Sequence, residues 1–299
     1  MTVALALREA ADALAEVSDT PRLDAELLMA HVLGVSRPEM LLYAMRDPVP
    51  AGIASLVVRR LRHEPVAYIL GVQEFYGLDL IVTPDVLIPR GDSETLVEAA
   101  RADLAERPPE RILDLGTGSG ALLLAALSLW PAARGVGIDR SLGAMAVAAA
   151  NAGRLGMATR ARILHDDWNR PGWIEALGRF DLILANPPYV EDVAALAPQV
   201  RGYEPAGALF SGIDGLDAYR VLIPQLPSLL APDALAVVEI GATQADAVGA
   251  LGGAAGLSAT LHRDLAHRPR ALALRNKAFK KALGKPGDPH YLEAKPVGG

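Results

Sequence analysis

Residues 111–120, Arg-Ile-Leu-Asp-Leu-Gly-Thr-Gly-Ser-Gly, combine a short apolar run with a glycine-rich turn. The run 111–115 is typical of a buried strand, and the apolar stretch 121–130 predicts a helix packed over it. Glycines in such a turn let the main chain approach a ligand closely at a helix N-terminus. Gly116 and Gly118 also fit the dinucleotide-binding pattern G-x-G-x-x-A. The stretch therefore predicts a nucleotide site without choosing the nucleotide.

Segments of strand and helix pattern alternate on both sides of this turn. Such alternation predicts a parallel, doubly wound sheet, because crossover helices return each strand in the same direction. The sequence therefore predicts an α/β fold, with strands at 111–115, 135–139, 162–165, 181–185 and 234–240, helices at 121–130, 142–155, 214–230 and 243–251, and a closing strand pair at 257–263 and 270–275.

Two of the predicted strands are followed by acidic residues. Asp139 ends the second strand, where a carboxylate can accept hydrogen bonds from both hydroxyls of a ribose, in NAD as well as in an adenosine cofactor. Asp166, Asp167 and Trp168 follow the third strand. An acid there can accept from an adenine amino group, and the indole can lie against the ring. A loop tryptophan that only packs locally is the competing interpretation of Trp168.

The segment 180–189, Phe-Asp-Leu-Ile-Leu-Ala-Asn-Pro-Pro-Tyr, separates the nucleotide classes. A buried strand stops at Asn186, which Pro187 keeps extended. Because prolines contribute no N–H, the carbonyls of Asn186 and Pro187 form a rigid group of acceptors at the carboxyl end of a strand. Such a group suits a planar –NH2, which methyl transfer to nitrogen requires and a dehydrogenase does not. An Asn-Pro turn without function is the alternative.

Composition narrows the function classes. The chain has 299 residues, is 51% hydrophobic and has no cysteine, which excludes disulfides, thiol nucleophiles and Cys-ligated zinc. We expect no membrane span, and no metal site at the isolated His31 and His63. Residues 1–276 carry 24 Arg against 33 Asp and Glu, a balance that disfavours non-specific binding to nucleic acid.

The flanks differ from the α/β region, and four parts are predicted from the pattern. Apolar residues at helical spacing dominate the N-terminal part, a strand pair forms around Gly77, and all five lysines lie in the last 23 residues. The predicted parts are a helical domain at 1–75, a hairpin linker at 76–90, the main domain at 91–276 and a mobile basic tail at 277–299.

Two details of the main domain concern its loops. We expect Asp92 to cap a helix that runs to about Glu106. Residues 190–213 are rich in proline and glycine and predict a long irregular loop beside the acceptor group. Because loops of this length are usually functional or disordered, this one is a candidate lid.

Several stretches together carry a resemblance to one family: Asp24-Ala-Glu-Leu-Leu28, Glu64-Pro-Val-Ala-Tyr-Ile-Leu-Gly71, Glu74-Phe-Tyr76, Leu87-Ile-Pro-Arg90, Asp114 to Gly120, Asp167-Trp168, Asn186 to Tyr189, and Glu204-Pro205 through Leu216. Over roughly residues 20–275 the chain resembles the release-factor glutamine methyltransferases, the HemK/PrmC family. Gly91 and Ser93 stand where that family usually has proline and threonine, and His267 and Pro269 where it usually has glycine and aspartate.

The resemblance implies a Rossmann-like, seven-stranded methyltransferase sheet with a small helical N-terminal domain. It implies that the glutamine amide in the Gly-Gly-Gln motif of class 1 peptide-chain release factors is methylated with S-adenosyl-L-methionine, leaving S-adenosyl-L-homocysteine. The helical domain would dock the release factor. The enzyme is expected to be a cytoplasmic monomer without nucleic-acid or membrane partners.

The resemblance also implies roles for single residues. The cofactor would contact Gly116, Thr117, Gly118, Ser119, Gly120, Asp139, Trp168 and Asn186. The glutamine would be held by Asn186, Pro187, Pro188 and Tyr189, of which Asn186, Pro187 and Tyr189 would act in catalysis.

Two alternatives stay open on the residues alone. An RNA or DNA base methyltransferase would place the –NH2 of a base in the same acceptor group, although a DNA enzyme should carry a basic target-recognition domain and this body is acidic. A dehydrogenase or nucleoside-binding module would use the glycine turn and Asp139 without transferring a methyl group.

Overall fold

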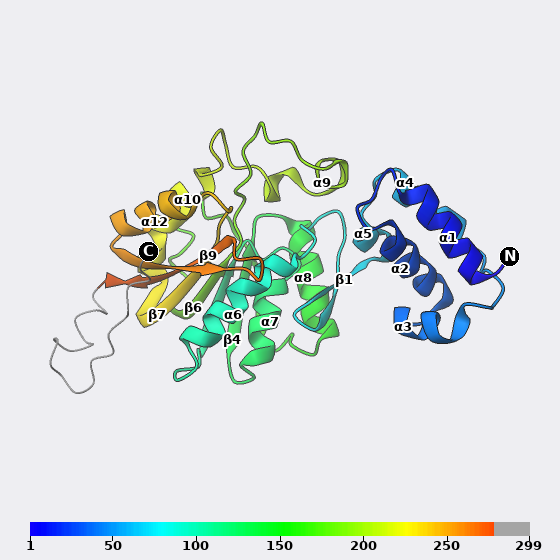
Figure 1. Cartoon of the computed structure of the whole chain (residues 1–299). Coiled ribbons are helices and arrows are strands. Elements are labelled where there is room, and N and C mark those ends of the chain that lie inside the picture. Colours follow the sequence, from blue (N-terminus) through cyan, green and yellow to red (C-terminus); the bar gives the residue numbers. More distant parts are fainter. Residues whose placement is uncertain (278–299) are drawn as a thin grey trace.

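The computed structural model describes residues 1–277, which form a small helical domain beside a larger α/β domain (Figure 1). The predicted tail lies outside the described residues from position 278 onward. Within residues 1–277, the structure has no helix that is long and apolar enough to cross a membrane.

The α/β domain is built on a seven-stranded sheet with the order β5-β4-β3-β6-β7-β9-β8. Strands β3 to β7 are parallel to their neighbours in this group, whereas β9 is antiparallel to both β7 and β8. The doubly wound sheet and its closing strand pair, as predicted, are confirmed. The strands are β3 (Arg111–Leu115), β4 (Arg134–Asp139), β5 (Ala161–His165), β6 (Phe180–Ala185), β7 (Leu230–Glu239), β8 (Leu257–Arg263) and β9 (Pro269–Asn276).

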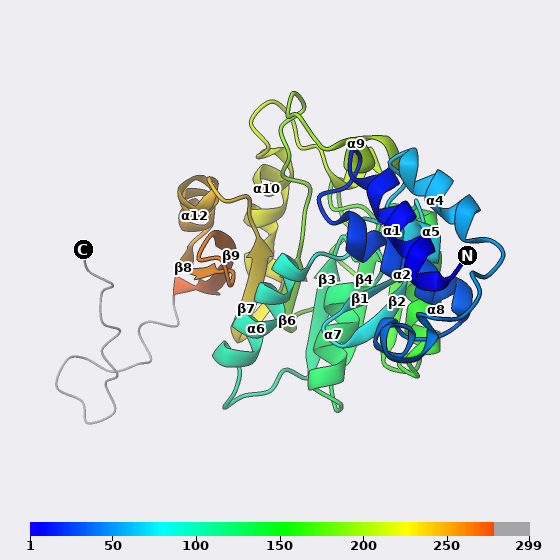
Figure 2. The ribbon, with the colours of Figure 1, turned by 45° about the vertical axis from the view of Figure 1, so that its right-hand side comes forward.

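Helices cover both faces of the sheet (Figures 1 and 2). Strand β3 needs cover on both sides because Ile112, on one face, and Leu113, on the other, are completely buried. One face packs against α6 (Glu94–Asp103), α7 (Ala121–Leu129) and part of α8 (Leu142–Arg154), and the other packs against α10 (Asp217–Leu222), α11 (Leu226–Leu229) and α12 (Ala245–Ala254).

The strand order reverses at β3, which lies between β4 and β6. The helix after β3 leads to one side of the sheet and the chain later returns to the other side. In open α/β sheets this switch point leaves a crevice at the carboxyl ends of the strands, where ligands bind. Here the crevice is bordered by the residues that follow Leu115, Asp139 and Ala185.

The helical domain has its own apolar core. Two acids of the Asp24-Ala-Glu stretch are buried there with arginine partners: Asp24 pairs with Arg60 at 2.7 Å, and Glu26 pairs with Arg37 at 2.7 Å. The domain consists of α1 (Val3–Leu14), α2 (Pro21–Leu33), α3 (Arg37–Glu39), the π-helical turn η1 (Met40–Ala44), α4 (Ile53–Leu61) and α5 (Val66–Leu70).

A hairpin of β1 (Val72–Phe75) and β2 (Leu78–Ile81) follows the helical domain, and it turns at Tyr76 and Gly77 as predicted. Asn151 of α8, which is completely buried, ties this hairpin to the α/β domain. Its Nδ2 donates to the carbonyls of Ile81 and Ser119, both at 2.9 Å, and its Oδ1 accepts from Ile81 N at 2.7 Å. One side chain therefore joins the linker to the glycine turn.

We expect Asn151→Ala to lower the free energy of unfolding by about 2–4 kcal/mol, because it leaves several buried backbone groups without partners. Urea unfolding followed by circular dichroism measures this. Asn276→Ala is the control, since the Asn276 side chain makes no hydrogen bond within residues 1–277. Equal stabilities of the two variants would contradict the assigned role of Asn151.

Three local predictions are wrong. Asp92 does not cap a helix; it lies in the 3-10 turn η2 (Gly91–Ser93), and its Oδ2 accepts from Arg268 at 3.0 Å and from Arg270 at 2.9 Å. The helix expected at 214–230 is broken into α10, the turn η4 (Ile223–Gln225) and α11, because Pro224 and Pro227 interrupt it. The segment 190–213 contains α9 (Pro198–Tyr203) and the short turn η3 (Ala206–Ala208).

Candidate active site

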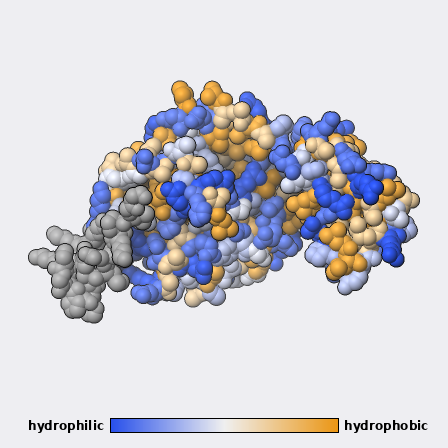
Figure 3. All heavy atoms as spheres, viewed as in Figure 1, coloured by the Kyte–Doolittle hydropathy of each residue, from blue (hydrophilic) through white to orange (hydrophobic). Residues whose placement is uncertain are grey.

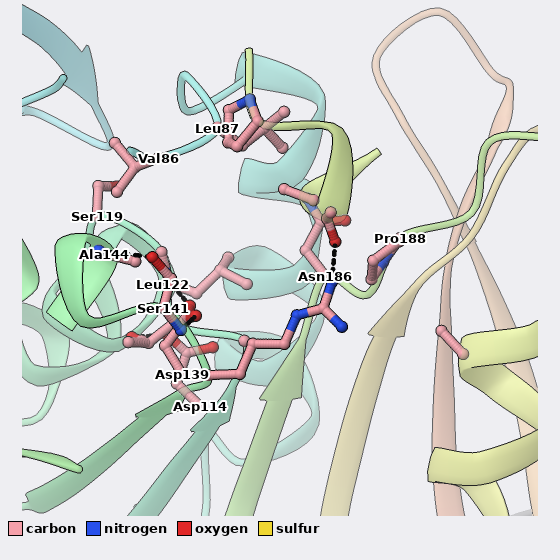
Figure 4. A pocket seen from close by; sticks show the side chains of 18 of the residues that line it. Val86, Leu87, Asp114, Ser119, Leu122, Asp139, Ser141, Ala144, Asn186 and Pro188 are labelled. Carbon is pink, nitrogen blue, oxygen red and sulfur yellow. Dashed lines mark hydrogen bonds between the residues drawn. The ribbon is translucent and has the colours of Figure 1, made fainter. Parts of the chain in front are cut away.

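A cavity of about 430 Å³ lies at the carboxyl ends of β3, β4 and β6 (Figure 4). Parts of the chain that are far apart in sequence line it, among them the glycine turn after β3, the segment 85–93 and the segment 205–212. The volume is in the range of roughly 300–1,000 Å³ that small-molecule sites have. The cavity therefore occupies the crevice that the strand order creates.

The glycine turn has a backbone that requires glycine. Gly116, Gly118 and Gly120 have φ values of 74°, 54° and 84°, in the left-handed region that other residues rarely adopt. A Cβ on Gly116 would lie 3.2 Å from the ring of Trp168. The indole therefore packs against the turn, and both line the cavity, whereas contact of the indole with a ligand ring stays a prediction.

The polar side chains of the turn are buried beneath it. Thr117 is 5% exposed and donates from Oγ1 to Oδ2 of Asp114 at 2.6 Å, and Ser119 is 3% exposed. Burial raises the pKa of Asp114 to about 7, although the hydrogen bond from Thr117 opposes this rise. The Thr117 hydroxyl is therefore bound to Asp114.

Asp139 is held over the same turn at the end of β4. Its Oδ2 accepts from Gly118 N and its Oδ1 accepts from Ser141 N, both at 2.9 Å. Ser141 in turn caps α8 by accepting from Ala144 N at 3.2 Å. The carboxylate lines the cavity where a ribose contact is predicted (Figure 4).

Asn186 reaches the cavity from the end of β6, together with Pro188 (Figure 4). Its Nδ2 donates to Ser93 Oγ at 3.3 Å. Within residues 1–277, its Oδ1 accepts no hydrogen bond, and no N–H donates to the carbonyl of Pro187. Unused acceptors are therefore present at the end of β6.

Pro187 and Tyr189 do not line this cavity. Pro187 is buried, and the Tyr189 hydroxyl donates to Oε1 of Glu239 at 3.2 Å. The Tyr189 carbonyl accepts from Nε2 of Gln244 at 3.1 Å, which fixes the chain after the prolines. In this arrangement Tyr189 anchors the motif to the end of β7, and its predicted position over a substrate amide stays a prediction.

Two polar side chains behind Asn186 are not predicted from the sequence as site residues. Ser93 is 4% exposed and Glu239 is 1% exposed. Burial raises the pKa of Glu239 to about 7, while the nearby hydroxyl of Ser93 and attraction by Arg270 lower it. The sequence offered one signal, the position of Glu239: it is the last residue but one of the strand predicted at 234–240, and in the structure it ends β7 at the same edge of the sheet as Asp139.

Arg90 is another cavity residue without a predicted role. It pairs with the buried carboxylate of Glu204, which also accepts from Ile88 N at 3.2 Å. This contact fastens the linker to the segment after α9. Both residues belong to stretches that carry the family resemblance, and no other feature of the sequence points to a role for them.

Comparison with known proteins places the chain in a family. Two family models match it, the PrmC N-terminal domain over residues 6–71 and the methyltransferase small domain over residues 92–200. The release factor glutamine methyltransferase of Rhodospirillum rubrum is 44% identical over 284 residues, which cover 93% of this chain and 84% of that protein. The chain belongs to the release factor glutamine methyltransferase family. The resemblance found in the sequence is thereby confirmed.

Further members of this family are similarly close. The release factor glutamine methyltransferase of Cereibacter sphaeroides is 41% identical over 283 residues, covering 92% of this chain and 99% of that protein. The one from Bordetella pertussis is 45% identical over 252 residues, covering 82% of this chain and 92% of that protein. Because these matches span both the helical and the α/β domain, family membership makes the chain a methyltransferase.

Proposed function

We propose that this chain transfers a methyl group from S-adenosylmethionine to the side-chain amide nitrogen of the glutamine in the Gly-Gly-Gln motif of class 1 peptide-chain release factors. The observation that carries the proposal is the unpaired Oδ1 of Asn186 at the end of β6, inside the cavity. An unpaired acceptor at that point suits an N–H of a planar amide. The shared name of the three relatives agrees with this substrate.

The residues of the cavity fit a nucleoside-bearing methyl donor. Asp139 would accept hydrogen bonds from the ribose hydroxyls, and Trp168 would pack against the adenine. The glycine turn would face the ligand with its backbone, because its threonine and serine side chains are buried. When bound, S-adenosylmethionine supplies an electrophilic methyl group on a positively charged sulfur.

The contribution of Asn186 and Pro187 is to hold and polarise the nitrogen. Oδ1 of Asn186 and the carbonyl of Pro187 would accept the two N–H groups of the glutamine amide. The lone pair of an amide nitrogen is delocalised, so the nitrogen must become pyramidal and positive as it reacts. Acceptors on its hydrogens stabilise that state more than the ground state. As the bond from nitrogen to the methyl carbon forms and the bond from that carbon to sulfur breaks, S-adenosylhomocysteine leaves, and the nitrogen then releases one proton to solvent. Positioning can remove about 7–11 kcal/mol of the barrier at best.

The proposal is tested by supplying a radiolabelled methyl donor and offering a release factor and total RNA in separate reactions. We expect label in the factor, and none in a factor whose Gly-Gly-Gln glutamine is replaced by alanine. Label only in RNA would overturn the proposal in favour of a base amino-group methyltransferase.

Calorimetry separates the methyltransferase from a dehydrogenase or a nucleoside-binding module. We expect S-adenosylhomocysteine to bind and NAD to bind far more weakly. The acceptors at Asn186 are placed to bind N–H groups of an amino or amide nitrogen, and hydride transfer requires no such acceptors. Affinity for NAD alone would contradict both methyltransferase hypotheses.

Two exposed apolar side chains beside the cavity are candidates for contact with the release factor, in addition to the predicted docking on the helical domain. Val193 is 84% exposed and Ile213 is 87% exposed, at the tips of two loops joined by hydrogen bonds between Asp192 and Gly212. Figure 3 shows orange tips above the α/β domain, where these loops lie in Figure 1. Because Gly212 also lines the cavity, a protein that inserts a loop there would contact these tips.

We expect Ile213→Asp to raise KM for the whole release factor by about tenfold, because burying an unpaired carboxylate in an apolar contact costs free energy. KM for a short Gly-Gly-Gln peptide should stay unchanged. The control is Leu265→Asp, which changes a fully exposed leucine on the loop between β8 and β9. Equal effects on factor and peptide would contradict a docking role for the tip.

A further inference from the structure

Three polar side chains form a row that leads from the cavity to the end of β7. Nδ2 of Asn186 donates to Oγ of Ser93 at 3.3 Å. Oε1 of Glu239 accepts from the Tyr189 hydroxyl at 3.2 Å, and Ser93 lies near enough to the same carboxyl to lower its pKa. Oε2 of Glu239 is buried and has no partner with hydrogen-bond geometry within residues 1–277.

The donors and acceptors in this row fix its direction. The oxygen of Ser93 receives a hydrogen from Asn186, so the hydroxyl hydrogen of Ser93 is left for another acceptor. An ionised carboxylate only accepts, so the buried Oε2 of Glu239, unpartnered within residues 1–277, is the acceptor that we infer for that hydrogen. Ser93 can then offer only lone pairs to Asn186. The amide must present its NH2 to Ser93, and its oxygen is directed into the cavity.

We propose that Ser93 and Glu239 act as a relay that sets the orientation of the Asn186 side-chain amide, with the oxygen facing the substrate nitrogen. Ser93 is thus a positioning residue, and its hydroxyl is the functional group. The inference rests on the proposed function, because an amide turned the other way would present N–H groups to the N–H groups of glutamine. Without the relay, the two orientations of the amide become similar in energy.

Protonation of Glu239 reverses the relay. A neutral carboxyl can donate to Ser93, whose own hydrogen then binds the oxygen of Asn186 and removes the acceptor. Four other groups face Glu239: Tyr189 after β6, Tyr219 on α10, Arg270 on β9 and Asp92 in η2. Burial raises the pKa of Glu239 to about 7. Activity should therefore fall as the pH is lowered through about 7.

The test compares Ser93→Ala with Ser93→Thr, which keeps the hydroxyl, and with Ser128→Ala, which removes an exposed serine hydroxyl from α7. We expect Ser93→Ala to lower kcat about tenfold or more, as expected for a weakened transition-state hydrogen bond. KM for a Gly-Gly-Gln peptide and the Kd of S-adenosylhomocysteine should change less than about threefold, within ordinary context effects. Ser93→Thr should keep the kcat of the wild-type protein, and Ser128→Ala should have the same kcat as the wild-type protein.

The pH profile of kcat distinguishes the relay from a merely structural role of Ser93. In the wild-type protein and in Ser93→Thr, kcat should fall on the acid side of the profile with a midpoint near pH 7. In Ser93→Ala this fall should be absent. Normal kcat with the same acid limb in Ser93→Ala would overturn the relay.

A second readout does not depend on methyl transfer. In ¹⁵N NMR spectra with S-adenosylhomocysteine present, the side-chain NH2 signal of Asn186 should move with pH through about 7, and Ser93→Ala should abolish the movement. An Asn186 NH2 signal that does not move with pH in the wild-type protein would overturn the relay. Failure to methylate a release factor, with this titration intact, would overturn the proposed function and leave the relay standing.

Discussion

Replacing Asn186 with alanine should lower kcat by about 10²–10³-fold, the loss seen when one preorganised transition-state hydrogen-bond partner is removed. The substitution deletes a side-chain acceptor that is placed in the cavity without a hydrogen-bond partner among residues 1–277. It leaves the glycine turn and Asp139 untouched. The affinity for S-adenosylhomocysteine, measured by calorimetry, should therefore fall by much less than kcat.

Two further variants make this prediction specific. Asn276→Ala removes an asparagine side chain that has no hydrogen bond within residues 1–277 and should keep full activity. Thermal unfolding of Asn186→Ala should match the unchanged chain, because its single side-chain hydrogen bond is only part-buried. Turnover of Asn186→Ala within tenfold of the unchanged chain would contradict the role of Asn186.

Replacing Asp139 with alanine should weaken S-adenosylhomocysteine binding by about 10²-fold or more, since hydrogen bonds to a charged group contribute about 1.5–3 kcal/mol each. The carboxylate would be lost as acceptor for the ribose. It would also be lost for Gly118 N and Ser141 N, which hold the turn and the start of α8. Calorimetry at fixed pH measures the change.

The effect of Asp139→Ala should lie in binding rather than in the chemical step. At saturating methyl donor, kcat should recover most of its value, since Asn186 is unaffected. Asp103→Ala is a suitable control, because Asp103 pairs with Arg275 at the end of α6, outside the cavity lining. An unchanged dissociation constant in Asp139→Ala would reject the ribose assignment.

Most of the sheet was predictable from the sequence because each central strand is a short apolar run followed by a turn signal. The run 111–115 and the run 181–185 are buried on both faces, which removes the ambiguity between strand and surface loop. The break in the helix at 214–230 was also visible, since Pro224 and Pro227 stand inside it. Helix propensity alone therefore predicts a single helix that is longer than the separate helices observed.

The site was predictable only where its residues lie on a local motif. The glycine turn, Trp168 and Asn186 follow strands and Asp139 ends one, and the structure brings all of them except Gly120 to the lining of one cavity. Their individual contacts to cofactor and substrate stay predictions.

Residues that act through tertiary contacts could not be found in this way. Ser93, Asn186 and Glu239 meet only because the turn η2 and the ends of β6 and β7 lie at the same edge of the sheet. No spacing in the sequence shows this. The same reason explains Asp92, which does not cap a helix because its carboxylate binds Arg268 and Arg270 at the start of β9. It also explains Tyr189, whose hydroxyl is bound by Glu239.

The most direct measurement is a crystal structure of the chain with S-adenosylhomocysteine and a Gly-Gly-Gln peptide. The glutamine amide nitrogen should lie about 2.7–3.2 Å from both Oδ1 of Asn186 and the carbonyl oxygen of Pro187. A glutamine side chain bound elsewhere, or an Asn186 oxygen turned away from it toward Ser93, would contradict the account.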